Sequence, residues 1–163
     1  MSRKSLITAL VIAMFMLSVV PTSSAYKGYQ LSRGPVDDFT LTNQNNESVN
    51  LSDFRGDVII VAFIFTKCPD VCPIITQLLR SVDEGLTADY QDHVSIVSIS
   101  VDPEYDTPEM LKDYTELHGV DWPHLTGDLA VMEPIWESFG LVVQKNVIDA
   151  HLGDINGHQA EDS

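Results

Sequence analysis

The chain has few basic residues and only two cysteines. Its 163 residues include nine Lys and Arg against 24 Asp and Glu, which gives a formal net charge of -15. Because so acidic a surface repels phosphate backbones and anionic lipids, we exclude nucleic acid as a partner. Two cysteines are too few for a disulfide-stapled scaffold, whereas the length suits one domain with a core of its own.

The first 25 residues have the composition of a targeting segment. Arg3 and Lys4 precede an apolar run over residues 6–20, and small residues follow up to Ala25. This order predicts a signal peptide over residues 1–25. An uncleaved membrane anchor is the alternative, although the run is shorter than the roughly 20 residues that span a bilayer. Either way, we expect the rest of the chain to be extracytoplasmic, with membrane association only if the segment is retained.

The remaining chain predicts a leader at residues 26–38 and one α/β domain over residues 39–163. Two continuous apolar runs rich in β-branched residues alternate with helical patterns, which is typical of parallel strands joined by helices. The first of these runs is expected at the centre of the sheet. The expected elements are a hairpin at 39–51, strands at 58–65 and 94–101, and helical patterns at 74–82, 108–118 and 129–139.

The last stretch of the chain, residues 146–163, is polar and has no apolar periodicity. A sheet that begins in this way normally ends with another hairpin and a covering helix. The sequence therefore predicts that this closing hairpin and helix are missing from the chain.

Both cysteines lie where the first apolar run meets a helical pattern. Cys68 and Cys72 are separated by three residues. A helix N-terminus stabilises the thiolate, which is the nucleophilic and metal-ligating form of cysteine. A disulfide across so short a loop removes little unfolded-state entropy, so it is a poor structural staple. The spacing therefore predicts a redox pair or a site for a soft metal such as Cu(I).

Two thiolates make an incomplete copper site, and an imidazole is the most suitable third ligand. Histidines at helix ends often cap carbonyl groups, and those in polar tails are usually solvated. The residues alone do not decide which histidine is the third copper ligand. The candidates are His93 and His118 at helix ends, His124 in a loop that approaches a sheet end, and His151 and His158 in the polar tail.

Four motifs occur in the order known from one family of proteins. The stretch Thr66–Pro73 resembles the copper-site motif of the Sco/SenC family, and Val101–Pro108 is similar to that family's second signature. Leu125–Gly127 and Phe139-Gly140 fit its later landmarks. The resemblance implies a thioredoxin-like fold with a central sheet and flanking helices. It also implies a copper-binding, thiol-redox protein that serves assembly of the dinuclear copper centre of cytochrome oxidase.

The resemblance implies copper ligands and partners as well. Family members use both motif cysteines, here Cys68 and Cys72, as Cu(I)/Cu(II) ligands and as a redox pair, with a histidine far downstream. His158 is the first choice for that histidine and His151 the second. The family's Asp-His-Ser or Asp-His-Thr group is not found, so a ligand beyond Ser163 is the third possibility. The implied partner is the copper-bearing subunit of cytochrome oxidase or another copper or thiol carrier.

Three functions are compatible with the thiols. The first is copper delivery as a metallochaperone. The second is thiol–disulfide exchange on partner cysteines, although dedicated thioredoxin-like reductants more often have two residues between the cysteines. The third is a peroxidase on the same fold, against which the Pro-Asp-Val spacer and the second signature both speak.

The second signature also contains two carboxylates, Asp102 and Asp106. The order Asp106-Thr107-Pro108 is typical of a helix start, with Thr107 as N-cap and Pro108 as the first helical residue. We therefore expect neither carboxylate to be catalytic.

Overall fold

A mixed sheet organises residues 34–144, which are the residues that this computed structural model describes. Its strand order is β2-β1-β5-β4-β3. Strands β3, β4 and β5 are parallel, whereas β1 is antiparallel to both β2 and β5. The strands are β1 (Thr40–Asn43), β2 (Ser48–Asn50), β3 (Val58–Ile64), β4 (Val94–Ser100) and β5 (His124–Thr126). The helices are η1 (Leu51–Phe54), α2 (Val71–Gly85), α3 (Ala88–Gln91), α4 (Pro108–His118) and α5 (Leu129–Ser138).

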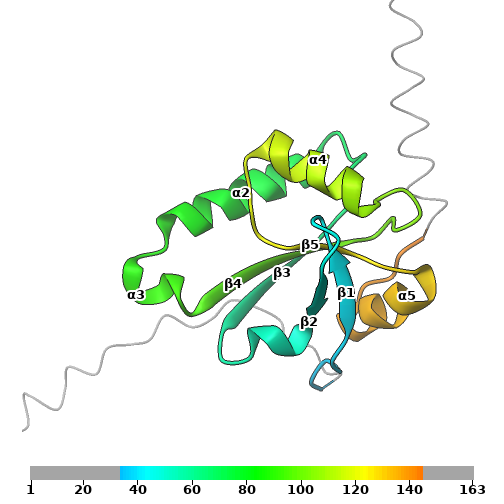
Figure 1. The fold of residues 1–163 in the computed structure, drawn as a ribbon, viewed down its shortest axis with the longest axis horizontal. Helices are drawn as coiled ribbons and strands as arrows, with labels where there is room; N and C mark the ends of the chain where they lie inside the picture. Colours follow the sequence, from blue (N-terminus) through cyan, green and yellow to red (C-terminus); the bar gives the residue numbers. More distant parts are fainter. Residues whose placement is uncertain (1–33, 145–163) are drawn as a thin grey trace, which may run out of the picture. The chain divides into compact units, whose positions relative to one another are not determined.

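Helices cover both faces of the sheet, as Figure 1 shows. Side chains alternate between the two faces along each strand, so one strand supplies both cores. On one face, Ile99 and Leu125 pack with Trp136 of α5. On the other face, Ile64 packs with Leu111 of α4 and with the two cysteines. The α/β class and the thioredoxin-like arrangement expected from the sequence are confirmed.

Strand β3 and helix α2 each have a feature that the sequence pattern does not record. Strand β3 is parallel to β4 as predicted, and among residues 34–144 it lies at one edge of the sheet, with β2 at the other. Helix α2 forms over the predicted pattern, yet Ile74 and Leu78 are 64% and 63% exposed. Helical periodicity predicts the helix, but it does not show how much of the helix surface packs against the sheet. The buried positions of α2 are instead Cys72 and Thr76.

Helix α4 begins and ends as its sequence predicts. The Thr107 side chain accepts a hydrogen bond from the Met110 N–H over 3.3 Å, and Pro108 occupies the first helical turn. The helix ends at Gly119, whose φ of 64° is a left-handed conformation that glycine adopts without steric cost. These boundaries fix the loop that precedes the helix, residues 101–107.

Several sequence expectations lie outside the described residues. They are the signal peptide or anchor, most of the leader, both tail histidines and the missing C-terminal hairpin and helix. Within residues 34–144, no helix combines the length and apolar character needed to cross a bilayer.

His124 is a core residue of β5 rather than the loop residue expected from the sequence. It is fully buried, and its ring stacks on Trp122 with the ring centroids 5.7 Å apart. Nδ1 lies 3.0 Å from the Trp122 carbonyl, whereas Nε2 has no hydrogen-bond partner among the described residues. Burial lowers the pKa of His124 to about 4, because a charged imidazolium would lose its hydration here.

We predict that this histidine makes the fold acid-sensitive. Below pH 6.5 the unfolded chain takes up a proton at His124, whereas the folded chain does so only near pH 4. Folding stability should therefore fall by about 3 kcal/mol between these pH values. Urea unfolding of the wild type and of His124→Gln at pH 7 and pH 4.5 measures the difference. An equal pH dependence in both proteins would contradict the assignment.

Candidate functional site

The carboxyl ends of β3 and β4 lie level with each other. In the parallel register Ile64 pairs with Ser100, and the Val101 N–H donates to the Ile64 carbonyl over 2.8 Å. The loops that follow, residues 65–70 and 101–107, therefore leave the sheet side by side. This is the end of a parallel sheet where α/β proteins normally carry their functional loops.

The first of these loops and the start of α2 bring the two cysteines together, as the sequence predicted. The Cys68 N–H donates to the Phe65 carbonyl over 3.1 Å and closes a turn. Helix α2 then begins at Val71, and the Cys72 N–H donates to Cys68 Sγ over 3.4 Å. The two residues are only 6% and 5% exposed, and both thiols are free. The site is thus a buried dithiol at a helix N-terminus.

The two thiols differ in acidity. Burial works against the Cys68 thiolate, but backbone N–H groups at the start of α2, first that of Cys72, lower the pKa of Cys68 below its usual value. Burial raises the pKa of Cys72 to about 12, and the charges of Cys68 and Asp106 add to this effect. Cys68 is therefore the more acidic thiol of the pair, and it is the better candidate for the nucleophile.

An apolar groove of about 520 Å³ opens beside the dithiol. Both cysteines line this groove, and little of either is exposed among the described residues. Besides the two cysteines, its lining includes Phe63, Phe65, Val71, Ile75, Val101 and Leu141. The lining favours an extended apolar segment over a polar small molecule.

The second loop supplies two contacts to the cysteine loop. Lys67 Nζ lies 3.4 Å from the centroid of the Tyr105 ring, a cation–π contact. The buried Asp106 carboxylate accepts hydrogen bonds from the Thr66 N–H over 3.1 Å and from the Ser100 hydroxyl over 2.6 Å. Sequence reasoning explained Asp106 only as part of a helix start. Its place just after β4 was the signal that could have brought it to the site.

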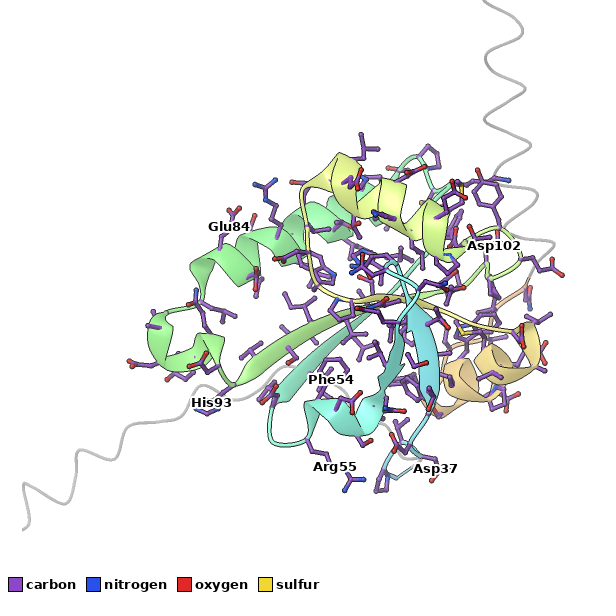
Figure 2. The ribbon with its side chains drawn as sticks, viewed as in Figure 1. Asp37, Phe54, Arg55, Glu84, His93 and Asp102 are labelled. Atoms are coloured by element: carbon purple, nitrogen blue, oxygen red, sulfur yellow. The ribbon has the colours of Figure 1, made fainter. Side chains whose placement is uncertain are left out.

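The structure makes three of the candidate histidines unsuitable as the third copper ligand. His93 precedes β4, at the opposite end of that strand from Asp102 (Figure 2). Seven residues of strand, about 23 Å, separate the two ends. His118 ends α4 and packs on Tyr114 with centroids 4.3 Å apart, and His124 is sealed in the core. Within residues 34–144, no three His, Cys, Asp or Glu side chains gather as a metal site.

The sheet, its flanking helices and the dithiol at the start of α2 define a thioredoxin-like thiol protein. A family model described as SCO1/SenC matches residues 30–161. The chain therefore belongs to the SCO1/SenC family, as its sequence motifs predicted.

Known relatives agree with this placement. The SCO1 protein homolog of Bacillus subtilis is 36% identical over 115 residues, which are 68% of this chain and 59% of that protein. Among solved structures, BsSco, a member of the Sco family of cytochrome c oxidase assembly proteins with an identified disulfide switch, is 33% identical. It superposes with a TM-score of 0.59 over 68% of each chain. Copper-bound ScoI of Bradyrhizobium japonicum is 34% identical, with a TM-score of 0.54 over 63% of this chain and 65% of that one.

We predict that the two thiols react at different pH. In Cys72→Ser, Cys68 should be alkylated by iodoacetamide with an apparent pKa below that of a free cysteine, because the helix N–H groups remain. In Cys68→Ser, Cys72 should react only at strongly alkaline pH. Alkylation rates between pH 5 and 11, followed by mass spectrometry, give both values. The same apparent pKa in the two variants would refute the assignment of Cys68 as the more acidic thiol.

Proposed function

We propose that the chain is an extracytoplasmic copper-binding protein that delivers copper for assembly of the dinuclear copper centre of cytochrome oxidase. The observation that carries the proposal is the buried dithiol of Cys68 and Cys72 at the start of α2, within a chain of the SCO1/SenC family. The copper-bound relative supports copper as the metal. The signal-like segment at residues 1–25 supports the location.

The donors in the described site fit Cu(I). Thiolates are soft ligands, and a soft monovalent ion prefers them over carboxylates or water. One thiol already has a lowered pKa, and metal binding displaces the proton of the other. The apolar surroundings, Phe65 and Leu111 among them, exclude water that would compete for the metal.

A histidine completes the proposed site. His158 is our first choice and His151 the second, and both follow the described residues. Gln144, the last described residue, lines the groove beside the thiols.

A second activity, thiol–disulfide exchange, is favoured by the acidity difference between the thiols. The Cys68 thiolate attacks a partner disulfide and forms a mixed disulfide, which releases one partner thiolate. Cys72, after losing its proton, then attacks Cys68 Sγ and releases the second partner thiolate. The partner gains two electrons, and Cys68 and Cys72 end as a disulfide. This exchange would keep a copper-receiving cysteine pair reduced.

We predict that replacing one cysteine removes tight Cu(I) binding without unfolding the chain. Cys68→Ser and Cys72→Ser should each lose at least a hundredfold in Cu(I) affinity, because one thiolate cannot hold the ion alone. Competition with a chromophoric Cu(I) chelator measures the affinity, and circular dichroism checks the fold. Ser138→Ala, on the distant helix α5, is the matched control. Unchanged affinity in both cysteine variants would exclude the site.

We predict that His158 matters more for Cu(II) than for Cu(I). Cu(II) accepts nitrogen ligands in a tetragonal arrangement, whereas two thiolates largely satisfy Cu(I). His158→Ala should therefore change the Cu(II) charge-transfer band and the electron paramagnetic resonance spectrum, and His151→Ala should not. If His158→Ala matches the wild type, the third ligand is His151 or another group.

A further inference from the structure

Asp106 is a buried carboxylate for which copper binding and thiol exchange have so far given no role. Its residue is 0% exposed. Burial raises its pKa, although hydrogen bonds from Ser100 and Thr66 act in the opposite direction. Among the residues that the structure describes, its recorded partners are neutral hydroxyl and amide groups. Burying a carboxylate without a cationic partner is costly, and a buried apolar side chain would avoid that cost.

The carboxylate joins the two loops at the carboxyl ends of β3 and β4. Oδ1 accepts from both the N–H and the hydroxyl of Thr66, over 3.1 and 2.5 Å. Oδ2 accepts from the hydroxyl of Ser100, the last residue of β4, over 2.6 Å. The Ser100 Oγ in turn accepts from the Asp102 N–H over 3.0 Å. Asp106, which lies in the second loop, thus binds the first loop through Thr66 and the end of β4 through Ser100.

The hydrogen bonds between Asp106 and Thr66 also affect Cys68, which follows Thr66 by two residues. Both residues belong to one tight turn, from Phe65 to Cys68, which is closed by the hydrogen bond from the Cys68 N–H to the Phe65 carbonyl. A shift of Thr66 would move this turn and with it Cys68 Sγ. The Sγ would then lose the hydrogen bond that it accepts from the Cys72 N–H over 3.4 Å at the start of α2.

We propose that Asp106 is a positioning residue that holds the cysteine loop through Thr66, so that Cys68 Sγ stays at the N-terminus of α2 and within bonding range of one metal shared with Cys72. This inference deepens the proposed function, on which it rests. The carboxylate does not touch the metal or the partner. Its two oxygens accept from three donors, two on Thr66 and one on Ser100 at the end of β4, and a smaller or apolar side chain cannot replace them.

The test compares side chains at position 106 in the full chain. Asp106→Ala removes every acceptor, whereas Asp106→Asn keeps one oxygen for Thr66. Thr66→Val removes the hydroxyl donor from the other side. Asp113→Asn, on the exposed face of α4, is the control for loss of one negative charge. Three quantities are measured for each variant: Cu(I) affinity by chelator competition, the rate of Cys68 alkylation at pH 7.5, and the free energy of unfolding in urea.

We expect Asp106→Ala to lower the Cu(I) affinity and the Cys68 alkylation rate at least tenfold, at urea concentrations where the variant is fully folded. Asp106→Asn should keep most of the Cu(I) affinity and of the alkylation rate, and Asp113→Asn should match the wild type in both. In Asp106→Ala, the further change Thr66→Val should have little additional effect. Wild-type copper affinity and alkylation in a destabilised Asp106→Ala would overturn the proposal and leave a purely structural role.

Equal losses of Cu(I) affinity and alkylation rate in Asp106→Asn and Asp106→Ala would also overturn the proposal, because the loss of the negative charge would then explain the effect. The alkylation rate keeps this test separate from the proposed function. If the wild type binds no Cu(I), copper delivery fails. The alkylation rates then still decide whether Asp106 positions Cys68.

Discussion

The parallel register of β3 and β4 is the constraint on which the site depends. Because Ile64 pairs with Ser100, both strands end at the same level and their loops leave the sheet together. One loop carries Cys68 into α2, and the other carries Asp106 into α4. A slip of one residue would turn each side chain of β3 to the opposite face and separate these loops. The chemistry of the dithiol thus begins with strand pairing.

The start of α2 then gives the thiols of Cys68 and Cys72 different acidities. Cys68 Sγ accepts a hydrogen bond from the Cys72 N–H in front of the helix, whereas Cys72 is the second residue of α2 and is buried in a cluster with Leu111 and Tyr114. The same helix therefore favours the thiolate at one sulfur, and burial favours the thiol at the other. That difference suits ordered thiol exchange, and the closeness of the two sulfur atoms suits a shared soft metal.

Much of this could be predicted from the sequence, because local patterns determine it. The β-branched runs gave β3 and β4, the Thr107-Pro108 pair gave the start of α4, and the cysteine spacing gave the dithiol. Relations across the sheet could not be predicted in this way. The position of β3 at a sheet edge within residues 34–144, the exposure of Ile74 and the burial of His124 depend on which elements pack together, and no local pattern records that. Asp106 was underestimated for the same reason, since its partners lie 40 and 6 residues away.

The central claim is that Cys68 and Cys72 bind one copper ion together. X-ray absorption spectroscopy at the copper edge of the Cu(I)-loaded chain tests it most directly, because sulfur and nitrogen or oxygen neighbours scatter differently. The account predicts two sulfur neighbours per copper in the wild type and one or none in Cys72→Ser. A wild-type spectrum fitted by nitrogen and oxygen neighbours alone would contradict it.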